Sequence, residues 1–420
     1  DGSCLANLQC TFNRDAGLEP ETEAALEKAV TGAAVVIEGT LVESPAAGQK
    51  WELAAKRIVM AGEVDAGFPL QKKKHSLAFL REISHLRART NTFGAVARVR
   101  SRLAFAVHEF FQQRGFQYAH TPIITVSDAE GAGSMFRVAA DIPGADGVDG
   151  EKKPFFGRNA YLTVSGQLEA ETYALALSRV YTFGPTFRAE NSNTTRHLAE
   201  FWMIEPEAAF FELEDNMALA TEFITFLLRT ALEECGDDLA FFNERIQPDL
   251  IETLTAVVNS KFTHITYTDA VAELEKHAGA FEFKPYWGCD LQSEHEKFLT
   301  EEVAHGPVIV TDYPAAIKAF YMKMNDDGKT VRAMDVLVPR LGEIIGGSER
   351  EADYAKLKAR MESLGMDTNA YSWYLDLRRY GSVPHSGFGL GFERLIQYVT
   401  GMVNIRDVIP YPRAVGQAAP

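Results

Sequence analysis

The sequence has little cysteine and no long apolar run. Its four cysteines, Cys4, Cys10, Cys235 and Cys289, are too few and too scattered along 420 residues to predict a disulfide framework or a zinc site. Scattered cysteines in a chain of this length are typical of a reducing compartment. No stretch of about 18 apolar residues occurs and no signal-peptide pattern opens the chain, so the sequence predicts no membrane partner.

Two common nucleotide-binding motifs are also missing. No GxxxxGK[ST] phosphate loop occurs anywhere. The glycine-rich stretch from His385 to Leu395 has glycines at every second position, without the GxGxxG spacing and following acid of a dinucleotide site. A bound nucleotide would therefore depend on arginines and a metal ion.

The charge is unevenly distributed along the chain. A formal net charge of −16 argues against a protein that coats nucleic acid indiscriminately. Between Lys56 and Arg102, however, eleven Lys or Arg oppose three acids, a local charge of +8. Such a run is either a solvated face or a phosphate-facing hinge. Its place between a small β-region and a large domain favours the hinge.

We predict three parts of the chain. Residues 1–70 contain a helix over 20–30 and strands over 34–42 and 51–60, typical of a small barrel, but too few strands to close one. We therefore expect the first strands of the barrel to precede Asp1. The expected location is the cytoplasm, or an organelle if a targeting segment also precedes Asp1. Residues 71–92 form the basic hinge, and residues 93–420 read as one α+β domain.

The most informative stretch, residues 180–207, is predicted to be an antiparallel hairpin with a long polar loop. Alternation places one set of side chains on a common face: Thr182, Thr186, Arg188 and Glu190 on the outgoing strand, and Phe201, Met203, Glu205 and Glu207 on the returning strand. A salt-bridged exposed face would explain any single pair. It explains the whole set poorly, because such a face rarely carries a bare Phe as well.

Two further elements flank this hairpin. Apolar residues at helical spacing predict an amphipathic helix over 93–114, ended by Gly115 and followed by an extended stretch over 118–124 in which Pro122 suits an edge strand. Near the C-terminus, the alternate glycines predict a strand with one bare face, followed by a helix that carries Arg394. That face suits either tight packing or a flat ligand.

Together these motifs resemble the three motifs of class II aminoacyl-tRNA synthetases: motif 1 at about 97–124, motif 2 at 180–207 and motif 3 at 385–413. The stretches SDAEGAG, LTVSGQLEAET, FRAENSNT, GEIIGGSER and GFGLGFERLIQYVTGMVNIRDVIPYPR are similar to the bacterial-type asparaginyl-tRNA synthetases. The resemblance implies an α+β fold with an antiparallel sheet flanked by helices, preceded by an incomplete anticodon-binding OB-type barrel. It also implies ATP, Mg²⁺, L-asparagine and tRNA(Asn) as ligands and a homodimer through motif 1.

The resemblance assigns roles at an ATP site. Arg188 would bridge the α-phosphate and the substrate carboxylate, a task that suits its fork of donors. Glu190 would accept from the adenine amino group between Phe201 and Arg394, and Arg196 or His197 would meet the triphosphate tail. Asp335 and Glu343 match the family's Mg²⁺ carboxylates. Their spacing is one residue longer than in aspartyl relatives, which makes Asp335 the weaker assignment.

The resemblance also assigns the amino-acid site. Glu130, Ser165 and Gln167 would receive the substrate amino group, with Glu130 on a closing loop. Glu205 and Arg350 would bind the side-chain NH₂ and C=O of asparagine. Aspartyl relatives carry a lysine where this chain has Ala170, so an aspartate would face an uncompensated acid. Strict alternation would separate Glu343 from Arg350, and we therefore predict a bulge at Gly346–Gly347.

Three rival functions stay open on the sequence alone. A non-discriminating aspartyl-tRNA synthetase is the nearest, and Ala170 counts against it. A synthetase-like amidoligase that makes free asparagine would lack the barrel that residues 1–70 retain in part. A nucleic-acid-binding regulator with an inactive catalytic domain would not need the full set of Arg188, Glu190, Glu343 and Arg394.

Overall fold

A computed structural model describes residues 2–129, 135–140, 154–192 and 194–418. The chain forms two compact units, Asp1–Arg98 and Val99–Ala419, which are described separately below. Within the described residues, none of the helices has the length and apolar character needed to cross a bilayer.

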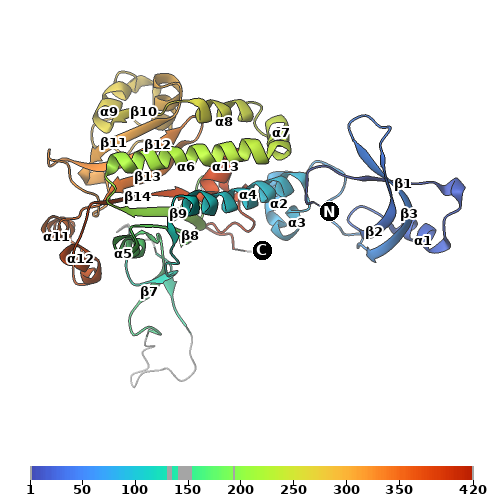
Figure 1. Cartoon of the computed structure of the whole chain (residues 1–420), viewed down its shortest axis with the longest axis horizontal. Coiled ribbons are helices and arrows are strands. Elements are labelled where there is room, and N and C mark those ends of the chain that lie inside the picture. The colour runs from blue at the N-terminus through green and yellow to red at the C-terminus, as the bar shows by residue number, and fades with distance from the viewer. Residues whose placement is uncertain (1, 130–134, 141–153, 193, 419–420) are drawn as a thin grey trace. The chain divides into compact units, whose positions relative to one another are not determined.

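The smaller unit is built on a three-stranded sheet of order β1-β3-β2 (Figure 1). The two predicted long strands are confirmed as an antiparallel pair, and β1 joins β3 in parallel. This pair has a bulge between Glu38 and Gly39, and glycine is needed there because a Cβ would meet the Ala54 carbonyl and the Ala55 Cα. The elements are β1 Gln9–Phe12, η1 Arg14–Ala16, α1 Pro20–Lys28, β2 Ala34–Glu43, β3 Trp51–Gly62, α2 Leu77–Glu82 and α3 Ser84–Arg87.

The predicted amphipathic helix is confirmed as α4, Asn91–Gln113. Its apolar stripe is fully buried, with Val99, Leu103 and Val107 at 0% exposure. Gly115 follows at a φ of +76°, which a residue with a side chain rarely adopts, so the chain leaves the helix at that point.

The larger unit contains an eight-stranded, mostly antiparallel sheet of order β10-β11-β12-β13-β14-β9-β8-β4. The predicted antiparallel fold class is thereby confirmed. The sheet strands are β4 Gln117–Tyr118, β8 Arg179–Phe187, β9 Glu200–Ala209, β10 Thr263–Thr266, β11 Val308–Pro314, β12 Thr330–Val338, β13 Gly342–Glu349 and β14 His385–Gly391. A smaller sheet comprises β5 Ile124–Thr125, β6 Arg137–Val138 and β7 Ala160–Leu162.

Helices pack against this sheet (Figure 1). Helix α6 crosses β12, β13 and β14, while α5 lies against β8 and β9, so the strands that carry the polar motifs are supported on rigid elements. The helical elements are α5 Gln167–Leu177, α6 Leu213–Glu234, α7 Gly236–Arg245, α8 Leu250–Asn259, α9 Tyr267–Glu275, η2 Ala278–Ala280, α10 Ser293–Phe298, η3 Leu299–Val303, η4 Ala315–Ile317, α11 Tyr354–Ser363, α12 Ser372–Arg379, α13 Phe392–Thr400 and η5 Ile405–Asp407.

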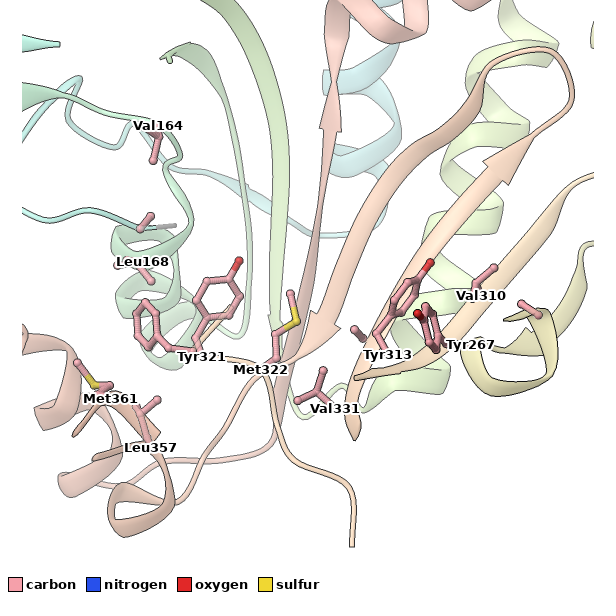
Figure 2. Close-up of a cluster of buried hydrophobic side chains, with 14 of the residues drawn as sticks. Val164, Leu168, Tyr267, Val310, Tyr313, Tyr321, Met322, Val331, Leu357 and Met361 are labelled. Atoms are coloured by element: carbon pink, nitrogen blue, oxygen red, sulfur yellow. The ribbon is translucent and has the colours of Figure 1, made fainter. Parts of the chain in front are cut away.

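A continuous apolar cluster joins distant parts of the larger unit (Figure 2). It runs from Leu168 on α5 through Tyr321 and Val331 to Tyr267 on α9, and it also holds Leu357 of α11. Burial of this much apolar surface fixes α5 and the strand ends, on which the candidate site depends.

Two local predictions were wrong. The stretch over 118–124 is not one edge strand: it is split between β4 and β5 in different sheets, and Pro122 belongs to neither. The register shift in the β12–β13 pair falls at Ile344, not at Gly346–Gly347, since Val336 pairs with Ile345 while Leu337 pairs with Glu343. One extra residue at Ile344 still resets the alternation, so Glu343 and Arg350 line one cavity.

Candidate functional site

The predicted hairpin is confirmed as β8 and β9. Thr182 pairs with Glu205 and Thr186 with Phe201, so the expected polar and aromatic side chains do share one face. Arg188 lies just beyond the end of β8, where its backbone N–H donates to the Ala199 carbonyl at 3.0 Å. This bond holds the first residue of the loop next to the returning strand.

A first cavity of about 320 Å³ opens between this loop and the glycine strand β14. Its walls include all the residues that the sequence assigned to ATP: Glu190, Arg196, His197, Phe201, Glu343 and Arg394, with Arg188. Gly389 and Gly391 form the bare part of the strand face. Gly387 does not contribute, because the Glu207 carboxylate occupies the space beside it.

Several side chains of the first cavity make only long contacts with one another. The Arg188 guanidinium lies 5.3 Å from the Phe201 ring centroid. Arg394 is 3.7 Å from Glu343, and the exposed pair Glu190 and His197 is separated by 3.8 Å. These distances leave room for a flat group and several anionic oxygens between cations.

A second cavity of about 270 Å³ adjoins the first. Arg188, Met203, Glu343 and Gly389 line both cavities. The second one is lined in addition by the predicted amino-acid residues Ser165, Gln167, Glu205 and Arg350, and by Asp335. Arg188 therefore stands where the two spaces meet.

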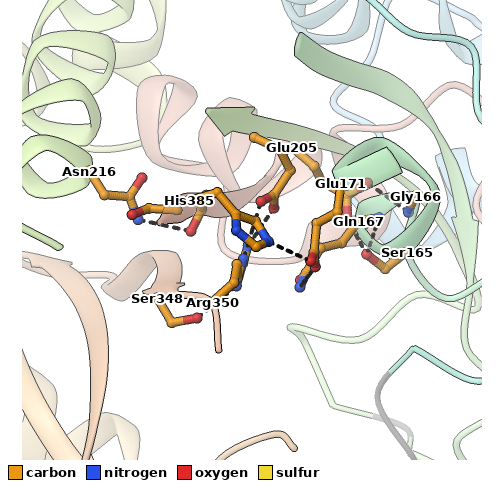
Figure 3. Close-up of polar contacts among 12 residues, drawn as sticks. Ser165, Gly166, Gln167, Glu171, Glu205, Asn216, Ser348, Arg350 and His385 are labelled. Atoms are coloured by element: carbon orange, nitrogen blue, oxygen red, sulfur yellow. Dashed lines mark hydrogen bonds and ion pairs between the residues drawn. The ribbon is translucent and has the colours of Figure 1, made fainter. Parts of the chain in front are cut away.

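The Glu205 carboxylate is fixed by three donors (Figure 3). Ser165 Oγ donates to one oxygen, while the Gly166 N–H and the Thr182 hydroxyl donate to the other at 2.9 and 3.0 Å. A carboxylate oxygen accepts more than one bond, so Glu205 retains capacity for an additional donor.

Arg350 forms a bidentate ion pair with Glu207, a partner that the sequence reasoning missed. The Nε–Oε2 and Nη2–Oε1 distances are 3.2 and 2.5 Å, and the two side chains are 2% and 0% exposed. Burial opposes the charge of Arg350, but the Glu207 carboxylate raises the pKa of the guanidinium above its ordinary value. Alternation had placed Glu207 on the same strand face as Glu205. That shared face is the sequence signal that could have identified Glu207 as a residue of the site.

Behind these residues lies a buried polar network centred on Glu171 (Figure 3). Gln167 donates to its carboxylate at 3.2 Å, Arg378 at 2.6 Å, and His385 Nε2 lies 3.0 Å away. Burial raises the pKa of Glu171, but Arg378 and His385 more than offset this and hold it well below its usual range. The network orients Gln167, and no motif in the sequence pointed to it.

Two carboxylates converge where the sequence placed a metal. Asp335 Oδ1 and Glu343 Oε1 each lie 3.3 Å from the position that a Cβ of Gly346 would take. Lys318 holds Asp335 at 2.7 Å. Among the described residues, no three His, Cys, Asp or Glu side chains gather as a metal site. Two carboxylates suit Mg²⁺, which commonly takes its other ligands from phosphates and water.

Two residues named in the sequence analysis are not placed at these cavities by the structure. Ala170 is fully buried in a small apolar cluster with Ala119, Ala174 and Val180 and does not line either cavity. Glu130 lies outside the described residues.

The chain is similar to members of a known protein family. The model for class II tRNA synthetases (D, K and N) matches residues 77–415. The asparagine–tRNA ligase of Treponema denticola is 66% identical over 99% of this chain and 90% of its own length. That of Desulfotalea psychrophila is 58% identical over 100% and 91%. The chloroplastic/mitochondrial asparagine–tRNA ligase of Arabidopsis thaliana is 54% identical over 100% and 76%.

The fold has solved counterparts as well. The asparaginyl-tRNA synthetase of Pyrococcus horikoshii, complexed with asparaginyl-adenylate, superposes with a TM-score of 0.87 at 34% identity. The match covers 98% of this chain and 90% of that one.

Proposed function

We propose a residue-level account of catalysis for this chain, which belongs to the class II tRNA synthetases of the aspartate, lysine and asparagine group. It is an ATP-dependent enzyme that activates L-asparagine to asparaginyl-adenylate, releases pyrophosphate, and transfers asparagine to the 3′ end of its tRNA. The observation that carries the account is the position of Arg188, which lines both cavities.

In the first cavity, Phe201 and Arg394 sandwich the adenine ring and Glu190 accepts from its amino group. Arg196 and His197 meet the triphosphate. Arg188 neutralises charge on the α-phosphate and orients the asparagine carboxylate for in-line attack. The two reactants are thereby held in the geometry that the reaction requires. Asp335 and Glu343 would hold Mg²⁺, which when bound offsets phosphate charge.

In the second cavity, Ser165 and Gln167 receive the amino group of asparagine, together with Glu130, which the resemblance alone assigns to this role. Glu205 accepts from the side-chain amide NH₂, and Arg350 donates to the amide oxygen. Aspartate would bring a carboxylate beside Glu205, which is 5% exposed and whose bonded donors, on Ser165, Gly166 and Thr182, are all uncharged. Like charges at short range in a buried site are costly, so this unneutralised acid excludes aspartate.

This selectivity differs from what Ala170 alone predicts. Ala170 packs among apolar side chains, so its contribution is the absence of a lysine that would neutralise the acids. The acids that act on the substrate are those that line the cavity.

We also propose association of two copies through motif 1. Several apolar side chains of α4 and the segment after it are exposed in the single chain: Phe105 at 64%, Tyr118 at 48%, Ile124 at 42% and Val126 at 46%. Exposed apolar residues gathered along one segment are typical of an interface.

The test is the Arg188→Ala variant. We expect asparagine-dependent ATP–pyrophosphate exchange to fall by at least about 1,000-fold, because the variant loses a donor that acts on both reactants. Arg229→Ala, on α6, is the control. Unchanged exchange in Arg188→Ala would refute the account.

Parallel charging assays with asparagine and aspartate separate this enzyme from a non-discriminating one, and formation of free asparagine without tRNA would indicate the amidoligase.

A further inference from the structure

A third cavity, of about 450 Å³, lies behind the ATP cavity in the larger unit. Arg196 lines both spaces. Its Nη1 donates to Ser293 Oγ, which faces the ATP cavity, and its Nη2 donates to the Leu341 carbonyl on the wall of the third cavity at 3.0 Å. The guanidinium therefore divides the two spaces and presents donors to each.

The walls of the third cavity favour an anion. They carry Arg196, Lys297 and Arg340 against one carboxylate, Glu301; of these cations, Arg340 is already paired with Asp249, which does not line the cavity. Lys297 is half-buried and makes no ion pair in the part of the chain that the structure describes.

Two residues that line this cavity each carry a buried polar atom with no hydrogen-bond partner among the described residues. These atoms are Tyr398 Oη and Gln397 Oε1, on side chains that are 6% and 7% exposed. Gln397 Nε2 donates to the Val403 carbonyl at 2.9 Å, which fixes the amide so that Oε1 is the available atom. A buried polar atom without a partner is costly, so such atoms mark a place where a ligand supplies the bond.

We propose that this third cavity binds the pyrophosphate released by asparagine activation, handed over past Arg196. This inference rests on the proposed function, because that reaction supplies the anion. Pyrophosphate matches the wall: its charged oxygens suit Lys297, Arg196 and the Tyr398 hydroxyl, and its protonated oxygen at neutral pH donates to Gln397 Oε1. Removal of the product anion from the ATP cavity would disfavour the reverse reaction.

The test measures pyrophosphate binding while the ATP cavity is occupied. The intact enzyme is saturated with α,β-methylene-ATP and asparagine, and pyrophosphate is titrated in by calorimetry. We expect one pyrophosphate per chain in the wild type. Lys297→Ala and Tyr398→Phe should each weaken this binding about tenfold, the loss of one charge-assisted hydrogen bond. Tyr398→Phe loses no hydrogen bond seen in the structure, so its melting temperature should equal that of the wild type.

Lys358→Ala and Tyr380→Phe, both remote from this cavity, are the matched controls and should bind pyrophosphate as the wild type does. No pyrophosphate binding to the saturated enzyme would overturn the inference, as would unaltered binding in both cavity variants. If Lys297→Ala instead raises only the KM for tRNA, the cavity takes an RNA phosphate and the inference is also overturned. In each of these cases, intact asparagine-dependent exchange shows that the proposed function itself stands.

Discussion

The two cavities that share Arg188 hold their polar side chains in different ways. In the ATP cavity, Glu343 is 37% exposed and lies 3.7 Å from Arg394, and Glu190 is 40% exposed and lies 3.8 Å from His197. In the amino-acid cavity, Glu205, Glu207 and Arg350 are at most 5% exposed and bonded into a network before any substrate arrives. A nucleotide brings its own charges, so weakly paired and partly exposed side chains suffice to bind it. The side-chain amide of asparagine is uncharged and offers only hydrogen bonds. Selection of asparagine therefore depends on protein groups whose positions are already fixed.

The largest effect on stability is expected when one arginine is removed from each cavity in turn. Arg350→Ala leaves the Glu207 carboxylate buried without its counter-ion, so the free energy of unfolding should fall by about 3–5 kcal/mol. Arg394→Ala removes a half-exposed cation, and the expected cost is only about 0.5 kcal/mol. Urea denaturation measures both values. Equal losses would show that the two cavities are not held differently.

A second test exchanges one glutamate for glutamine in each cavity. In Glu205→Gln, the amide can keep its bonds to Gly166 and Thr182, but it presents N–H donors where the substrate NH₂ needs an acceptor. We expect kcat/KM for asparagine to fall about 100-fold with the KM for ATP unchanged. Glu190→Gln should instead raise the KM for ATP alone. A change in the KM for ATP in Glu205→Gln would contradict the assignment.

The third test concerns the aromatic wall of the ATP cavity. Phe201→Leu keeps an apolar side chain but removes the flat surface beside the Arg188 guanidinium. Stacking of a base on an aromatic ring contributes about 1–3 kcal/mol, so the KM for ATP should rise about tenfold. The KM for asparagine should not change. Phe210→Leu, whose side chain is 67% exposed, is the control.

The contrast also explains what the sequence could predict. Alternation in β8 and β9 predicted the shared face correctly, because a strand periodicity is local information. The resemblance supplied residues that the structure brings together around the two cavities. The Glu171 network escaped prediction because it joins α5, α12 and β14, elements that only the tertiary fold brings together. The bulge was predicted for the glycines, yet it falls at Ile344 because Gly346 and Gly347 are needed for close packing against Asp335, Glu343 and Phe388.

The last test concerns Glu169, an acid behind the amino-acid cavity. Burial, with smaller contributions from Glu205 and Glu171, raises the pKa of Glu169 from 4.5 to about 7. Between these two pH values the folded chain holds a proton that the unfolded chain has released, so the free energy of unfolding falls as the pH rises through this window. Glu169→Gln cannot titrate. Its loss of stability from pH 5 to pH 8 should therefore be about 1–2 kcal/mol smaller than that of the wild type.

Denaturation with urea at both pH values measures this difference, and Glu222→Gln on the exposed face of α6 is the control. If Glu169→Gln and the wild type lose the same stability, then Glu169 is ionised in the folded protein. Burial behind the amino-acid cavity would then be too weak to keep this carboxyl neutral. Glu169 lines neither cavity, so the exclusion of aspartate from the cavity itself is tested separately, by the charging assays with both amino acids.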